Sequence, residues 1–219
     1  MRIVPPLIMA ATCFAWMVLY LGACEKRNYR TAFFYKLFAG LCFLLIGLHL
    51  ATGSRYAVLG CVGLGCGLLG DELLVLQSLR PEQPRRFFAL GGLAFSVGHG
   101  LYILAACVRH ARFVPTLILF AVFLAASLVY LKTQRFQAGR LQSACHCYIG
   151  IVAMMAAAAL SSALNAGGKQ FVMALGGLLF LLSDNVMLSL NFGDENTKAA
   201  DIAALTSYYL AQLLMAASI

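Results

Sequence analysis

The stretch Leu68–Leu76, LLGDELLVL, places two acidic residues in a segment that is otherwise apolar. It belongs to an apolar run from Tyr56 to Leu76. A run of about 20 residues is what an α-helix needs to cross the ~30 Å hydrocarbon core of a bilayer. A carboxylate in such a helix costs at least ~2.5–3.5 kcal/mol on insertion scales, so an acidic residue there is a candidate functional residue by default. Asp71 therefore indicates both a membrane helix and a candidate site.

The whole sequence shares this membrane character. Of its 219 residues, 62% are hydrophobic and only 11% are charged, and the mean hydropathy is +0.87. A soluble domain has about a quarter of its residues charged. Since no polar stretch is long enough for a separate soluble domain, we expect one membrane domain over residues 1–219 with short loops.

Hydropathy predicts eight membrane-spanning segments. They are Ile3–Ala23, Phe33–Ala51, Tyr56–Leu76, Phe87–Val108, Phe113–Tyr130, Ser143–Leu164, Phe171–Phe192 and Ala199–Ile219. The segments are continuously apolar and do not alternate, which favours helices over a β-barrel. The predicted fold class is therefore all-α, a polytopic membrane protein with eight transmembrane helices.

The positive charges predict the orientation of these spans. Loops one, three, five and seven carry eleven of the sixteen Lys and Arg residues, whereas the N-terminus, with Arg2, and the even loops carry five. The positive-inside rule places the odd loops in the cytoplasm and both termini on the non-cytoplasmic side. In a bacterium the protein would lie in the inner membrane. Because the cations are spread over short loops, no nucleic-acid partner is expected.

This orientation gathers the polar side chains of the spans in the cytoplasmic half of the bilayer. Asp71 lies about one turn, and Asp184 about two turns, from the cytoplasmic end of its span. Small or polar residues at helical spacing form stripes that should point into the bundle. The candidate pocket residues are Lys36, His99, Tyr102, Tyr148, Tyr208 and Gln212. Polar residues of this kind often only join helices, but a buried carboxylate is functional by default.

The other acidic residues near these spans are expected to meet solvent or a cation. Glu72 follows Asp71 but is turned by about 100° round the helix. We expect it to reach the interface or to pair with Lys36 or an arginine of loop three. Asp194 and Glu195 are expected to be solvated loop charges.

No metal or organic cofactor is expected. Most of the eight cysteines lie in or beside apolar runs, where free cysteine behaves as a small hydrophobe. In Cys145-His146-Cys147 the ligand-type side chains point to different faces of one helix, and four scattered histidines do not form a zinc site.

The two aspartate segments also resemble each other. GLLGDELLVL and FLLSDNVMLSL are offset by 113 residues, and the same offset aligns His99 with Gln212 and Tyr35 with Tyr148. The match suggests duplication of a four-span unit, with repeats over residues 1–110 and 111–219. Because four is even, the repeats would run parallel, and a two-fold axis along the membrane normal would bring Asp71 and Asp184 to one central cavity.

Four ordered motifs carry a resemblance to a known family. LLGDELLVL, FSVGHGLYILA, GGLLFLLSDNVMLSL and YYLAQLL, in this order, resemble the motifs of the YhhN-like family of transmembrane lysoplasmalogenases. The family typically has Lys-Pro-Leu at the start of span two, whereas YKLF here keeps Lys36 but has Leu37 in place of proline. The resemblance implies Asp71 and Asp184 as catalytic residues and the six polar residues above as pocket lining.

The activity that the resemblance implies is hydrolysis of the vinyl-ether bond of a lysophospholipid, the lysoplasmalogen. The reaction needs a proton donor, a negative group beside an oxocarbenium ion, and a base for water. Two carboxyls in different environments can supply these roles, as in glycosidases. Our hypothesis is that the two aspartates share a proton in a site that opens toward the cytoplasmic leaflet.

Two other classes remain open at this point. Intramembrane carboxylates at a repeat interface are also typical of proton-coupled carriers. A carrier, however, needs polar lining on both sides of the midplane, and the prolines here lie at span ends or in loops. A purely structural membrane subunit is the third class. Head-group preference and oligomeric state are not indicated by the sequence.

Overall fold

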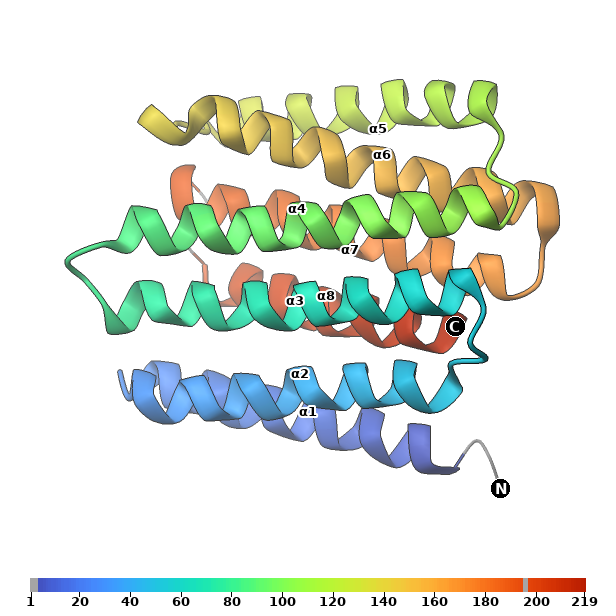
Figure 1. Cartoon of the computed structure of the whole chain (residues 1–219). Coiled ribbons are helices and arrows are strands. Elements are labelled where there is room, and N and C mark those ends of the chain that lie inside the picture. Colours follow the sequence, from blue (N-terminus) through green and yellow to red (C-terminus); the bar gives the residue numbers. More distant parts are fainter. Residues whose placement is uncertain (1–3, 195–196) are drawn as a thin grey trace.

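The computed structural model describes residues 4–194 and 197–219, so that Arg2, Ile3 and Glu195 lie outside the described residues. The described part is an all-helical bundle (Figure 1). Its helices are α1 (Val4–Glu25), α2 (Tyr29–Leu50), α3 (Arg55–Leu79), α4 (Pro84–Val108), α5 (Phe113–Thr133), α6 (Gln142–Ala166), α7 (Lys169–Phe192) and α8 (Lys198–Ser218), and a 3-10 turn, Gly139–Leu141, precedes α6. Each predicted span coincides with one helix, which confirms the all-α class.

Side-chain caps fix several helix starts. Asn28, Ser54 and Thr197 accept hydrogen bonds from backbone N–H groups in the first turns of α2, α3 and α8, which would otherwise lack partners. Pro84 stands in the first turn of α4, where its missing N–H costs nothing. The caps place these starts one to four residues before the apolar runs.

Seven of the described helices, α1 to α7, are long and apolar enough to cross a membrane. The eighth, α8, has 21 residues and packs along α7. Its Asp201, two tyrosines and Gln212 make it less apolar. The chain is thus a multi-pass membrane protein with seven helices of spanning character and an eighth in the same bundle.

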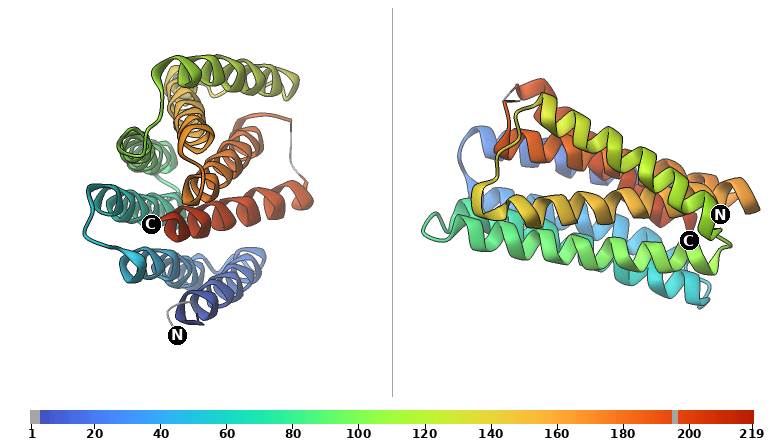
Figure 2. Two further views of the ribbon diagram at one scale, coloured as in Figure 1. Left: turned by 90° about the vertical axis from the view of Figure 1, so that its right-hand side faces the viewer. Right: turned by 90° about the horizontal axis from the view of Figure 1, so that it is seen from above.

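Consecutive helices pack against each other from α1 to α4 and from α5 to α8, and these two sets meet where α4 packs on α6 and where α8 packs on α2 and α3. Figure 2 shows α1 and α5 at opposite edges of the bundle. The start of α1 and the end of α8 lie at one end, with loops one, three, five and seven at the other (Figure 1). We call the latter the odd-loop end. Which end faces the cytoplasm stays a prediction.

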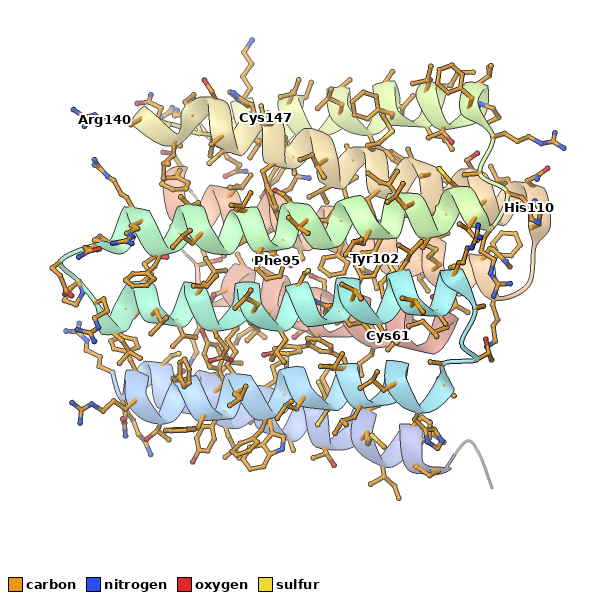
Figure 3. All side chains as sticks on the ribbon, viewed as in Figure 1. Cys61, Phe95, Tyr102, His110, Arg140 and Cys147 are labelled. Carbon is orange, nitrogen blue, oxygen red and sulfur yellow. The ribbon has the colours of Figure 1, made fainter. Side chains whose placement is uncertain are left out.

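A glycine row on α3 lets large side chains of α4 and α8 reach its backbone. A Cβ atom at Gly63 would lie 2.7 Å from the ring of Tyr102, and one at Gly70 would lie 2.7 Å from Phe95. Both rings lie between α3 and α4 (Figure 3). Gly60 and Gly67 similarly accommodate Ile219 and Gln212 from the end and middle of α8. This close approach fixes the positions of α4 and α8 beside Asp71.

The half of the bundle near the chain termini is filled by side chains. The hydroxyls of Tyr56 and Ser218 are 2.7 Å apart, and the Arg109 guanidinium lies 4.3 Å from the centroid of the Tyr56 ring. Ile219 is buried against Gly60. Packed side chains therefore close the bundle at the end near the chain termini, and we call this end the closed floor. The contact of α4 with α6 corresponds to that of α8 with α2 in two four-helix units, but the contact of α3 with α8 has no comparable counterpart between α7 and α4 among the described residues, and the duplication stays a prediction.

Candidate active site

A cavity of about 230 Å³ lies in the odd-loop half of the bundle, among α1, α2, α3, α4, α7 and α8. Asp71 and Asp184 both line it, from α3 and α7. Exposed residues at its outer part, Ser78, Asn191 and Asp201, mark the side that opens to the odd-loop end. The two aspartates thus share one cavity that has a solvent-accessible rim.

Asp71 is held by an ammonium group and a phenol. The Nζ of Lys36 lies 3.0 Å from Oδ1, and the hydroxyl of Tyr208 donates to Oδ2 at 2.6 Å. The amide of Gln212 donates to the Tyr208 oxygen at 2.9 Å, and Tyr102 donates to Gln212 at 3.4 Å. Lys36 is 5% exposed and Asp71 2%. The ammonium group of Lys36 and the phenol of Tyr208 each favour the ionised form of this carboxyl group, whereas its burial opposes that form.

Asp184 has a different set of partners. The hydroxyl of Tyr148 donates to its Oδ2 at 2.8 Å, and Nε2 of His99 lies 3.5 Å from the same oxygen. The Tyr148 hydroxyl and His99 Nε2 are also 3.5 Å apart, so the three groups form a triangle. The other ring nitrogen of His99, Nδ1, is buried without a hydrogen-bond partner in the described structure.

Aromatic rings pack between the side chains that contact the two carboxyl groups. Phe180 packs edge-on against His99 at 5.0 Å and against Tyr208 at 5.6 Å between centroids, and Phe95 packs edge-on against Tyr208. Within the described residues, no hydrogen bond or ion pair joins the two aspartates directly. A proton shared by direct contact is therefore not the arrangement seen, and each carboxyl group has its own protein partners.

The structure brings all eight predicted site residues together in this region. Lys36, Asp71, Asp184 and Tyr208 line the cavity itself. Tyr148 and His99 contact Asp184. Gln212 contacts Tyr208, and Tyr102 in turn contacts Gln212. Their catalytic and binding roles stay predictions, but their convergence is a property of the fold.

The expectation for Glu72 is wrong. Its side chain is buried, and neither carboxylate oxygen has a hydrogen-bond partner in the part of the chain that the structure describes. The ammonium group of Lys36 pairs with Asp71, and its Nζ also lies over the Tyr20 ring, 5.2 Å from the ring centroid. The turn of about 100° between adjacent helical residues directs Glu72 away from this pair.

Sequence reasoning missed the contribution of α1. Tyr20 and Cys24 line the cavity, and Lys198 forms an ion pair with Glu25 that ties the end of α1 to the start of α8. A signal was present, because Tyr20 and Cys24 are four residues apart and so lie on one helix face at the odd-loop end.

Comparisons with known proteins place the chain. A search of curated proteins and a search of solved structures gave no match. A family model, however, matches residues 31–219, from the first turns of α2 to the end of the chain, and includes both aspartates and all six pocket residues. This match covers most of the sequence and confirms the resemblance of the four motifs. The chain belongs to the YhhN family.

Proposed function

We propose that this protein is a lysoplasmalogenase. It would hydrolyse the vinyl-ether bond of lysoplasmenyl-ethanolamine or -choline to a fatty aldehyde and a glycerophospho-alcohol. Membership of the YhhN family, which is associated with this activity, supports the proposal. The observation that carries it is that two buried carboxyl groups with unlike partners line one cavity in a membrane-spanning bundle.

In this proposal Asp184 is the proton donor. The reaction begins when a proton is added to the β-carbon of the alkenyl group, which makes the adjacent carbon an oxocarbenium ion. A carboxyl group can donate this proton only while it is protonated. Asp184 has a phenol and an imidazole beside it, and among the described residues no lysine or arginine forms an ion pair with it, so it has no counterpart to the ammonium group of Lys36 that lies against Asp71. His99 would return a proton to it after each turnover.

Asp71 is then the group that is a carboxylate when the substrate binds. Its pairing with Lys36 keeps it negative, and a negative group beside the oxocarbenium ion stabilises the transition state. The same carboxylate can accept a proton from the attacking water, which adds to the cationic carbon to give a hemiacetal. Collapse of the hemiacetal breaks the carbon–oxygen bond to glycerol. The proton of the hemiacetal hydroxyl goes to the glycerol oxygen, so that the aldehyde and the alcohol are released, and the proton that Asp71 took from water is the one that His99 returns to Asp184.

The polar head group is expected at the rim of the cavity. Lys36 is occupied by Asp71, so it is not free to bind a phosphate. The odd-loop end carries further cations in exposed positions, including Arg85 and Arg86 at the start of α4. A phosphate held there would leave the ether bond deeper in the cavity, near the two carboxyl groups.

A proton-coupled carrier has less support from this structure. Alternating access needs a second route to the site from the opposite side of the membrane. Here the half of the bundle near the termini is filled by packed side chains, among them Tyr56, Met173 and Ile219. A flux measurement in proteoliposomes would test the carrier directly.

The test of the proposal is aldehyde release from a defined lysoplasmenyl lipid, followed by mass spectrometry. Asp71→Asn and Asp184→Asn should each lower kcat/KM by about 100-fold or more, because each removes a group that acts in the transition state. Asp194→Asn is the matched control, since Asp194 is exposed, pairs with Arg135 and is not among the residues that line the cavity, and it should stay within about threefold of wild type. Near-full turnover in either of the first two variants would contradict the two-carboxyl mechanism.

A further inference from the structure

A second cavity, of about 290 Å³, lies between α4 and α6 beside the polar cavity. We call it the α4–α6 groove. It is lined on α4 by Phe88, Gly92 and Phe95, and on α6 by Ala144, Tyr148 and Ile151. In both Figure 1 and Figure 2 these two helices draw apart toward the odd-loop end, where the groove lies. Two of its residues, Leu93 and Cys147, are exposed on the outside of the bundle, so the groove borders the lipid.

The groove offers no free polar group to a ligand. Its hydroxyls belong to Ser96 and Tyr148. Ser96 donates to the Gly92 carbonyl at 2.8 Å, and Tyr148 donates to Asp184. The remaining walls are aliphatic, aromatic, glycine or cysteine side chains. An occupant that satisfies such walls is a hydrocarbon, because a polar one would lose its hydrogen bonds to water without replacement.

The groove meets the polar cavity at a shared boundary. Four side chains, Leu74, Phe88, Phe95 and Met187, border both cavities. Tyr148 connects the two chemically, because it lines the groove while its hydroxyl lies 2.8 Å from the Asp184 carboxylate. The inner end of an apolar groove is thus one hydrogen bond away from the proposed proton donor.

We propose that the α4–α6 groove binds the alkenyl chain of a single-chain ether lipid, which deepens and rests on the proposed lysoplasmalogenase function. The chain would run from the bilayer between α4 and α6 to the boundary at Phe95, with the head group in the polar cavity. The β-carbon of a vinyl ether lies on the chain side, so it would face Asp184, and the ether oxygen would lie on the side of Asp71. This order agrees with Asp184 as the donor to the β-carbon.

The α4 wall of the groove runs from Phe88 to Ser96, about 12 Å along a helix. A long alkenyl chain would therefore fill the groove and continue outward past Leu93 and Cys147 into the bilayer, whereas a short chain would end inside it. Activity should then depend on the groove only for long chains.

Gly92 allows a clean test. A Cβ atom at Gly92 would meet no atom within 4 Å, so a large side chain there projects into open space in the groove. Gly100 lies two turns further along the same helix, is equally open, and does not line the groove, so Gly100→Phe is the matched control. Ala144→Phe fills the groove from the opposite wall and serves where Gly92→Phe does not fold.

The first measurement is kcat/KM for hexadecenyl and butenyl lysoplasmenyl-ethanolamine. Gly92→Phe and Ala144→Phe should lower the value for the hexadecenyl substrate at least about tenfold and leave the butenyl substrate within about twofold. Gly100→Phe should match wild type with both. An unchanged ratio between the two substrates in both filling variants would overturn the groove assignment while leaving the two-carboxyl mechanism intact.

A second measurement does not depend on activity. A saturated single-chain ether lysophospholipid with a diazirine in its chain is photolysed with the purified protein, and the labelled peptides are identified by mass spectrometry. Label on α4 and α6 that is lost in Gly92→Phe and kept in Gly100→Phe supports the groove. Label that Gly92→Phe and Ala144→Phe leave in place overturns it. If wild type releases no aldehyde, the proposed function fails and this labelling still decides the groove.

Discussion

Asp71 and Asp184 stand at similar depths on α3 and α7, yet their surroundings differ in charge. Asp71 is bound by a lysine of α2 and a tyrosine of α8. Asp184 is bound by a tyrosine of α6 and a histidine of α4. If the four-helix units are duplicates, α2 corresponds to α6 and α4 to α8. Each carboxyl group then has partners from two neighbouring helices that correspond between the units. Only Asp71 has a lysine among these partners.

The difference shows how a near-symmetric bundle can hold two carboxyl groups for opposite tasks. Two acids in identical surroundings would compete for one proton as a pair. A lysine beside one of them fixes its charge and leaves the proton to the other. The position matching Lys36 at the offset of 113 is Ile149, which carries no charge and is fully buried. In the proposed mechanism, this one cation is what distinguishes the roles of the two carboxyl groups.

Removal of Lys36 should give the largest effect on this comparison. In Lys36→Met the Asp71 carboxylate loses its cation, and breaking a buried pair in this way typically costs about 3–5 kcal/mol of stability. We expect a clear fall in the thermal unfolding midpoint in detergent and loss of aldehyde release. The double variant Lys36→Met/Asp71→Asn should recover most of the stability and none of the activity. A single variant as stable as wild type would show that the ion pair is not what holds Asp71.

The two tyrosines give a matched pair of smaller changes. Tyr148→Phe removes the one hydroxyl that donates to Asp184, and Tyr208→Phe removes one of two donors to Asp71. A hydrogen bond to a charged group is worth about 1.5–3 kcal/mol, so kcat/KM should fall about 10- to 100-fold in Tyr148→Phe. Tyr208→Phe should fall less, because Lys36 stays in place. The reverse order would argue that Asp71, and not Asp184, is the proton donor.

Gly67→Ala should perturb only the outer support of Asp71. A Cβ atom at this position would overlap the Gln212 amide, which would have to move away from Tyr208. We expect a loss of roughly fivefold in kcat/KM, equivalent to about 1 kcal/mol. Gly65→Ala lies two residues away on the same helix, where a Cβ atom meets nothing within 4 Å, and should be silent. Equal kinetics for the two variants would show that Gln212 does not position Tyr208.

Ser218→Ala should give the smallest effect and separate stability from activity. It removes the hydroxyl partner of Tyr56 on the closed floor of the bundle, away from both aspartates. Stability should fall by about 1 kcal/mol, seen as a small decrease in the unfolding midpoint, with kcat/KM unchanged. A change in kcat/KM would mean that the floor takes part in the reaction.

The sequence predicts the helices well because hydropathy and caps depend only on local residues. It also predicts the convergence of Asp71 and Asp184 on one cavity, because span direction and depth follow from loop order. It does not predict which side chain binds which. The direct pairing of Lys36 with Asp71 depends on how far the flexible lysine side chain reaches from α2. The lack of a hydrogen-bond partner for the Glu72 carboxylate in the described structure depends on how α3 is rotated about its axis.

The groove and the part played by α1 were also beyond sequence reasoning. Gly92 and Ser96 are on the same predicted stripe as His99, but in the structure they line the α4–α6 groove while His99 contacts Asp184. The splitting of one helix face between two cavities follows from the angle between α4 and α6, which no local pattern encodes. Tyr20 and Cys24 share one helix face, but whether that face meets the site depends on how α1 packs against α2 and α8.

The glycine row of α3 has a consequence for the history of sequences with this fold. Each glycine is matched to one bulky side chain across the interface: Gly60 to Ile219, Gly63 to Tyr102, Gly67 to Gln212 and Gly70 to Phe95. A methyl group gained on α3 therefore requires volume to be given up at the opposing residue. We expect relatives to change such positions in compensating pairs. Gly63 and Gly67 should vary least among relatives, because the residues opposite them form the hydrogen-bonded support of Asp71.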